Sequence, residues 1–258
     1  MKSRVRTKGG PSGRYVTHSV IDKGRDDGLA LGKNNADTAR ELNCQDILDA
    51  ILTDGAPVNT GCRNGAIPST ERELGRSLQR LVCQLHRYEC PMCHVFEYLD
   101  GGLGTSVSNS FKGPMGQNLT SVDVHKQDPV DFQPIKSNLV PLPDDTVNNI
   151  SRDQKVLYKY TIAIDSGNLN SKLAKQSPPA INHARWLTLC LKALLDYTRD
   201  SHLSSEKILF IKYIQEVYAP SLIHIKSHET LENGSKNVFY AMSLIRKLPK
   251  DVNIFAKK

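Results

Sequence analysis

The middle of the chain limits the fold most, because residues 100–149 are rich in Gly, Pro, Ser, Asn and Asp and show no clear helical or strand periodicity. A structureless stretch of this length is unusual inside a compact domain. We interpret it as an insertion, a linker or the joint between two halves. The expected division is a disordered tail over 1–14, an α/β region over 15–99, this Gly/Pro-rich segment, and a helical region over 150–258.

The first half of the chain contains two patterns that predict strands. Residues 15–22 (YVTHSVID) are rich in β-branched and aromatic side chains, which favour a pleated conformation. Residues 47–53 (ILDAILT) form a short apolar run that stops at Asp54 and Gly55. That run predicts a buried strand that ends at an acidic residue.

Capping-box patterns and prolines predict where helices begin and end. Thr70 with Glu73, and Ser151 with Gln154, have the spacing of a helix start. Pro91 is expected to interrupt the element that precedes it, because proline lacks an N–H group and clashes with the preceding turn.

The C-terminal part has apolar side chains at helical spacing, which predicts three helices over 184–248. The first begins at Ala184. The second begins near Ser205 and is expected to stop at Pro220. The third begins near Ser235 and ends before Pro249.

Composition limits the classes of partner. The net charge is +7, which allows attraction to a polyanion such as DNA; a solvated basic surface is the competing interpretation, since the charge is spread along the chain. No apolar run approaches the roughly 20 residues that a membrane span needs. No secretory signal pattern is present, so we expect an intracellular protein, without a membrane partner, whose six cysteines are reduced.

Five potential metal ligands, Cys83, His86, Cys90, Cys93 and His94, lie close together in the sequence. Two ligand pairs around one zinc ion normally come from separate arms, with about a dozen residues between them. If the stretch is helical, its ends are about 15 Å apart, too far for one tetrahedral ion. The spacing therefore argues against one zinc ion held by this stretch alone. A two-ligand contribution from Cys90 with Cys93, or from Cys83 with His86, would need partners from elsewhere such as His125, and packed thiols with a hydrogen-bonded histidine are the alternative.

Several segments together resemble the hAT superfamily of DNA transposases. They are LTDGAPVNTG over 52–61, CQLH over 83–86 and HARW over 183–186, in that order. The chain is also similar to transposase-like proteins of arthropod genomes, which share an LDG…F-x-GP-x-G stretch, here 99–116, and a VYAP segment, here 217–220.

The resemblance implies an RNase H-like fold. Such transposases hold two divalent ions, Mg²⁺ or Mn²⁺, on two aspartates and one glutamate, and the ions activate water or a 3′-hydroxyl for attack on phosphate. Asp54 matches the second aspartate of that triad. Cys83 and His86 match the Cys-x-x-His that follows it, and Arg185 and Trp186 match a later Arg-Trp pair. Each match also has a plain structural interpretation: a turn acid, a solvated arginine and a core tryptophan.

The chain departs from the family pattern in two places. No acid upstream of Asp54 matches the first aspartate, and the candidates for the final glutamate, Glu229 and Glu232, lie in a loop-like context. The sequence is therefore expected to be truncated at both ends. The fold class expected is α/β, with a partial RNase H-like sheet and helices followed by a mainly helical C-terminal half.

Two functions follow from these observations. The first is a degenerate transposase-derived protein without catalysis, nuclear in location, with weak binding to DNA or to copies of itself and no bound cofactor. The second is a helical protein–protein interaction module unrelated to transposition, built from the helices over 184–248.

Overall fold

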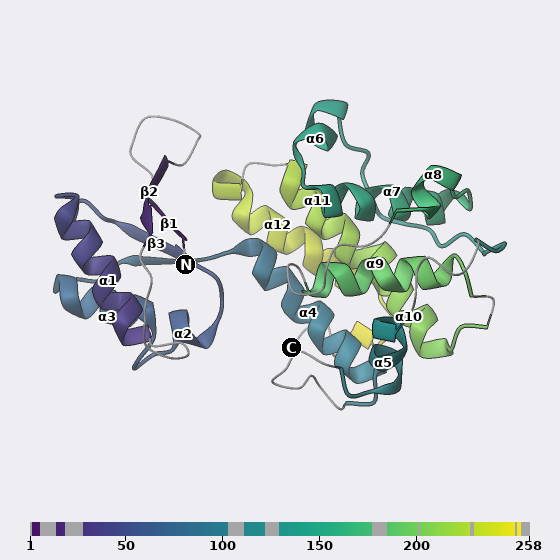
Figure 1. Ribbon diagram of the computed structural model, residues 1–258, viewed down its shortest axis with the longest axis horizontal. Coiled ribbons are helices and arrows are strands. Elements are labelled where there is room, and N and C mark those ends of the chain that lie inside the picture. The colour runs from purple at the N-terminus through teal and green to yellow at the C-terminus, as the bar shows by residue number, and fades with distance from the viewer. Residues whose placement is uncertain are drawn as a thin grey trace. The chain divides into compact units, whose positions relative to one another are not determined.

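The chain is mixed α/β and mainly helical (Figure 1). The computed structural model describes residues 2–5, 14–18, 28–102, 111–121, 129–176, 185–200, 202–227, 230–250 and 252–253. It divides into two compact units, Met1–His86 and Arg87–Lys258. The division lies at residue 86 and not within 100–149, whose described parts belong to the second unit.

The described residues of the first unit form two small pairs of strands and three helices. Strands β1 (Lys2–Val5) and β2 (Arg14–His18) pair antiparallel, so part of the expected tail is a strand. Residues 15–18 of the strand expected over 15–22 lie in β2, and residues 19–22 lie outside the described residues. The remaining elements are α1 (Gly28–Glu41), β3 (Ala50–Thr53), α2 (Pro57–Thr60), α3 (Ala66–Leu74) and β4 (Gln79–Val82). Strands β3 and β4 pair parallel, with α2 and α3 between them in the sequence.

The strand expected over 47–53 is shorter and more exposed than the sequence indicates. Within β3 only Thr53 is buried, and the Leu52 side chain is 65% exposed. Successive side chains of a strand point to opposite faces. Because β3 and β4 form a sheet of two strands, the face that carries Leu52 is left open. The prediction of a buried strand was wrong for this reason.

Helices α1 and α3 approach each other closely because α1 presents small residues to α3. A Cβ atom on Gly32 would lie 2.2 Å from Cβ of Ser69, a distance that no larger side chain tolerates. The buried residues of this α1 face are Gly28, Gly32, Ala36 and Ala39.

Thr70 does not begin a helix, contrary to the capping-box prediction. It lies inside α3, which begins at Ala66 after Gly65. Its hydroxyl lies 2.8 Å from the carbonyl oxygen of Ala66 and 3.3 Å from that of Gly32 in α1. A threonine hydroxyl in a helix commonly bonds to the carbonyl four residues earlier, and this one is also close to the neighbouring helix.

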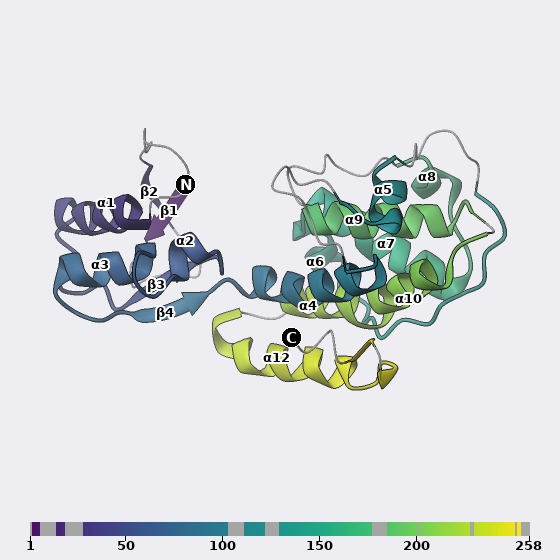
Figure 2. The ribbon, with the colours of Figure 1, turned by 90° about the horizontal axis from the view of Figure 1, so that it is seen from below.

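The second unit is helical, and its long helices include α4 (Gln84–Leu99), α7 (Arg152–Ser166), α9 (Arg185–Tyr197) and α12 (Thr230–Ile245). The shorter ones are α5 (Pro114–Ser121), α6 (Asp144–Asn149), α8 (Ser171–Ala174), α10 (Ser205–Tyr213), the π-helix η1 (Ile214–Tyr218) and α11 (Ala219–Ser227). Helix α9 packs against α5, α7 and α10 (Figures 1 and 2). Most of its side chains are buried, among them Leu189, Leu191 and Leu194.

Two helix predictions in this unit are confirmed. The backbone N–H of Ser151 donates to Gln154 Oε1 at 3.3 Å at the start of α7, and Val156 and Leu157 are buried on its inner face. Helix α12 ends before Pro249, as expected, but it begins at Thr230 and not near Ser235. Glu232 therefore lies in a helix and not in the loop that the sequence indicated. None of the helices in the described ranges combines the length and apolar character that crossing a bilayer requires.

Two prolines lie inside helices that they were expected to stop. Pro91 is part of α4, and Pro220 is part of α11. Pro220 cannot donate to the carbonyl of Glu216, four residues earlier. That carbonyl instead accepts from Asn138 Nδ2 at 2.9 Å, and the turn before Pro220 widens into the π-helix η1. The helical path therefore continues through Pro220, because a distant side chain replaces the missing donor.

Candidate functional site

The carboxyl edge of the β3–β4 pair brings together two of the residues that the sequence singled out. Thr53 and Val82 are opposite one another in the parallel register, so Asp54 and Cys83 follow the two strands at the same edge. The Cys83 N–H donates to the Thr53 carbonyl at 2.8 Å. In open α/β sheets, ligands commonly bind at this edge, which makes it the natural place to look for a site.

The Asp54 carboxylate is occupied by local hydrogen bonds. Its Oδ1 accepts from the Ala56 N–H at 3.0 Å and from Asn59 Nδ2 at 2.6 Å. Asp54 is exposed, whereas Asn59 is buried. This is the geometry of an acid that orders a turn before a short helix, and α2 begins directly after it at Pro57. The contacts of Asp54 match the turn-acid interpretation.

The Cys-x-x-His pair spans the end of β4 and the start of α4. Cys83 is half-buried, and the side chains of His86 and Arg185 lie outside the described side chains, as do those of Glu229 and Glu232. Within the described part of the chain, no group of three or more His, Cys, Asp or Glu residues could hold a metal ion.

Trp186 belongs to a cluster of aromatic rings in the second unit. Its ring lies 6.0 Å from those of Phe96 and Phe111 in edge-to-face arrangements. Phe96 also meets Phe210 at 5.1 Å. Edge-to-face contacts of this kind stabilise a core beyond the area they bury. The contacts of Trp186 therefore match the core interpretation.

The LDG…F-x-GP-x-G stretch forms a tight packing unit around Asp100. This residue follows α4 and is 2% exposed, and its Oδ1 accepts from the N–H groups of Met115 at 2.8 Å and Gly116 at 3.0 Å. These groups belong to the first turn of α5, where a carboxylate is favoured. A Cβ atom on Gly113 would lie 2.1 Å from the Asp100 carbonyl oxygen. Burial raises the pKa of Asp100, and the N–H bonds act in the opposite direction.

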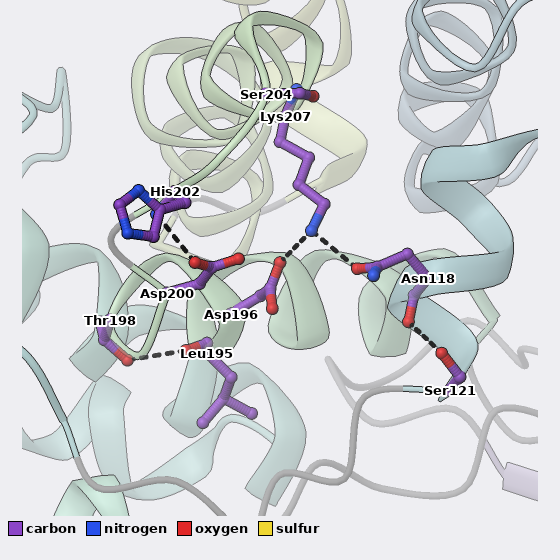
Figure 3. A network of polar contacts seen from close by, with 9 residues as sticks. All are labelled: Asn118, Ser121, Leu195, Asp196, Thr198, Asp200, His202, Ser204 and Lys207. Carbon is purple, nitrogen blue, oxygen red and sulfur yellow. Dashed lines mark hydrogen bonds and ion pairs between the residues drawn. The ribbon is translucent and has the colours of Figure 1, made fainter.

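A network of polar side chains holds the other end of α5 (Figure 3). Lys207 Nζ of α10 donates to Asp196 Oδ2 of α9 at 2.6 Å and to Asn118 Oδ1 of α5 at 2.7 Å. The Lys207 and Asp196 side chains are 11% and 8% exposed. Lys192 Nζ donates to the Thr120 carbonyl at 3.0 Å, and burial lowers the pKa of Lys192. Helix α5 therefore has an acid at its N-terminus and two amines near its C-terminus, which complements its dipole.

Sequence reasoning missed the pair of Asp196 and Lys207, because no spacing rule relates residues on different helices. One signal was present. Asp196 lies in RWLTLCLKALLDY over 185–197, a helix that is otherwise largely apolar, and a carboxylate in such a position needs a partner. The sequence could indicate that a cation was required, but not which one.

The π-helix η1 buries polar atoms in the helical core. Gln215 is fully buried, and among the described residues neither of its amide atoms has a hydrogen-bond partner. The buried Tyr218 hydroxyl likewise has none there. Burial raises the pKa of Tyr218, and the nearby Cys190 and Glu89 raise it further.

Replacing Gln215 by leucine is expected to stabilise the protein by about 1–3 kcal/mol, because leucine removes a buried amide without partners at similar volume. Urea unfolding of the wild type and the variant measures the difference. Gln133→Leu, at an exposed position, is the matched control and should change stability by less than about 0.5 kcal/mol. A loss of stability in Gln215→Leu would show that the amide is hydrogen-bonded in solution.

Of the residues singled out by the sequence, Asp54 has local hydrogen bonds and Trp186 packs against aromatic rings. Asp54 and Cys83 lie at one sheet edge in the first unit, and Trp186 lies half-buried against core rings of the second. Function must be argued from these sites, since a fold alone does not determine it. Comparisons with protein-family models, curated proteins and solved structures find no match to this chain.

Proposed function

We propose that this chain is a transposase-derived protein that no longer cuts DNA and retains weak, salt-sensitive DNA binding. The proposal rests on the hydrogen bonds of Asp54, the one residue matched to the acidic triad. Its Oδ1 orders the turn before α2 through Asn59 and Ala56. Each divalent ion of a two-metal site needs several oxygen ligands held close together, and one turn-forming carboxylate does not supply them.

The ancestry proposed for the first unit is a partial RNase H-like sheet. The parallel pair β3 and β4, with an acid directly after β3, favours this origin. The helical unit supports the same origin in another way. Two segments of the resemblance supply Asp100, Gly113 and Trp186, whose contacts are packing contacts. A chain that has lost catalysis can keep residues of this kind, because the fold still needs them.

DNA binding is proposed from charge. A net charge of +7 suffices for weak contact with phosphates. Two basic side chains that follow α12, Lys247 and Lys250, are exposed. Contacts of this type release counterions from DNA, so affinity falls steeply as salt rises.

The test is incubation of supercoiled plasmid with the protein and Mn²⁺ or Mg²⁺, followed by a gel-shift series in salt. We expect no nicking, and we expect DNA affinity to fall on the order of tenfold or more between about 50 and 200 mM salt. Asp54→Asn is the matched control, because it keeps the Oδ1 acceptor and removes the charge. Nicking by the wild type that disappears in Asp54→Asn would overturn the proposal.

A second candidate function, a helical interaction module, is favoured by a specific observation. Helix α12 exposes two large apolar side chains, Phe239 and Met242, which are 71% and 42% exposed. They are three residues apart, so they lie on the same side of the helix.

A further inference from the structure

Helix α12 has one face held in the helical unit and one face open. It packs against α11 and η1, and Figure 2 shows it along the outer edge of the unit. Its inner side chains, Asn237, Ala241, Leu244 and Ile245, are buried. Four outer side chains are exposed at helical spacing: Lys236, Phe239, Met242 and Arg246. We call these four residues the α12 face.

The apolar centre of the α12 face is not needed to hold the helix in place, since the buried residues on the opposite side do that. Single exposed apolar side chains are ordinary on protein surfaces. Phe239 and Met242 differ because they are adjacent on one face, about one turn apart. Aromatic side chains and methionine are enriched where proteins meet, and methionine adapts to varied apolar partners.

The rim of the α12 face is basic over its described side chains. From Asn233 to Lys250 the sequence contains no acidic residue. Lys236 and Arg246 flank the apolar pair, and Lys247 and Lys250 follow it. None of these four cations forms an ion pair with another described side chain, a set that does not include the side chain of Glu232, four residues before Lys236. The charges of Arg246, Lys247 and Lys250 are therefore available to a partner of opposite sign.

We propose that the α12 face binds an acidic amphipathic helical segment of another protein. Apolar side chains of that segment, spaced three and four residues apart, would pack on Phe239 and Met242, and its carboxylates would meet Lys236 and Arg246. The proposal rests on the interaction-module function and not on transposase ancestry.

Charge favours this occupant over a second copy of the chain. In an antiparallel pair of α12 helices centred on the apolar residues, Lys236 of one copy would lie opposite Arg246 of the other, and like charges would meet. In a parallel pair, each cation would face its own counterpart. A nucleic acid would satisfy the cations, but it would set Phe239 and Met242 against charged phosphates. An acidic segment with an apolar stripe satisfies both parts of the face.

The test uses the full chain and a labelled acidic peptide of about 15 residues, long enough to form helical turns on binding. Its leucines are spaced three and four residues apart, with glutamates elsewhere. A peptide of the same composition with scrambled spacing is the control. Fluorescence anisotropy should show binding of the first peptide and at least tenfold weaker binding of the second. Equal binding of the two would overturn the proposal, because charge alone would then explain the affinity.

Three variants locate the binding site. Phe239→Ser should weaken binding roughly 30-fold, the effect expected of an anchoring aromatic residue. Ile162→Ser, at an apolar position of α7 that is 43% exposed, should leave affinity unchanged. The double variant Lys236→Glu with Arg246→Glu should prefer a peptide with lysines in place of glutamates. Thermal unfolding checks that each variant is folded. Unchanged affinity in a folded Phe239→Ser variant would contradict the proposal.

Two other outcomes would overturn the acidic segment as the ligand while α12 remains a binding surface. A wild-type dimer in analytical ultracentrifugation that Phe239→Ser dissociates would keep α12 as an interaction surface, but its occupant would be a second copy. Displacement of the peptide by a DNA duplex, with tighter binding to the duplex that Phe239→Ser weakens, would make the occupant a nucleic acid. Either result overturns the acidic segment as the ligand.

Discussion

Lys207→Met is expected to lower the free energy of unfolding by about 3–5 kcal/mol, because the substitution leaves a buried carboxylate without its cation. Methionine keeps most of the apolar stem of the lysine and removes the amine. Asp196, 8% exposed on its side chain, then loses a partner at 2.6 Å. Asn118 Oδ1 loses the same donor, so the end of α5 is also released. Urea unfolding followed by circular dichroism measures the loss.

Two comparisons separate the buried ion pair from a general effect of losing a lysine. Lys136 lies 3.6 Å from Asp165 Oδ2, and its side chain is 83% exposed, so Lys136→Met should cost less than about 1 kcal/mol. The double variant Asp196→Leu with Lys207→Met should recover most of the lost stability, since replacing both charges of a buried pair is often neutral or stabilising. Equal effects of Lys207→Met and Lys136→Met would contradict the burial of the Asp196–Lys207 pair.

The sequence predicted well those helices that have local signals. Helix α7 begins at Arg152, directly after its local cap Ser151, and the apolar spacing of α9 alone marks it as buried. Predictions failed where a distant group decides the outcome. Pro220 continues a helix because Asn138, far away in the sequence, donates to the Glu216 carbonyl. No pattern near Pro220 contains that information.

The candidate site was predictable in parts. An apolar run that ends at an acid correctly indicated a strand before Asp54. It did not indicate that the strand would be short and exposed, because burial depends on how many strands join the sheet. Trp186 at helical spacing was correctly interpreted as a core candidate. The role of Asp100 could not be derived from its own neighbours, since its partners are the N–H groups of Met115 and Gly116 in another helix.

Gly113→Ala is expected to lower the free energy of unfolding by roughly 3 kcal/mol, because the added methyl group clashes with backbone atoms that can move only if the surrounding chain moves with them. The added Cβ would lie 2.1 Å from the Asp100 carbonyl oxygen and 2.2 Å from its Cγ. The start of α5 must then shift away from Asp100, and the N–H bonds from Met115 and Gly116 are lost with it. Gly102→Ala is the matched control. Gly102 has a φ of 73°, and no atom of the described residues lies within 4 Å of an added Cβ, so backbone strain of about 1 kcal/mol is the effect expected.

Asp100→Ala should cost a similar amount, because it removes the acceptor of the same two bonds. The double variant Asp100→Ala with Gly113→Ala then tests the mechanism. Both substitutions break the same contact. The double variant should therefore lose clearly less unfolding free energy than the sum of the two single losses. Full additivity in urea unfolding would show that Gly113 is required for a reason other than its approach to Asp100.

The pH dependence gives an independent check on Asp100, because burial raises its pKa above the ordinary value of 3.8. A carboxyl group with a raised pKa holds its proton more tightly in the folded protein than in the unfolded chain. Its contribution to stability is therefore fully present below 3.8 and is lost as pH rises through the folded pKa. Asp100→Asn keeps an Oδ1 acceptor and cannot titrate. Stability of the wild type relative to Asp100→Asn should accordingly fall as pH rises above 3.8. A difference that rises with pH would mean that the N–H bonds of α5 outweigh burial at this carboxylate.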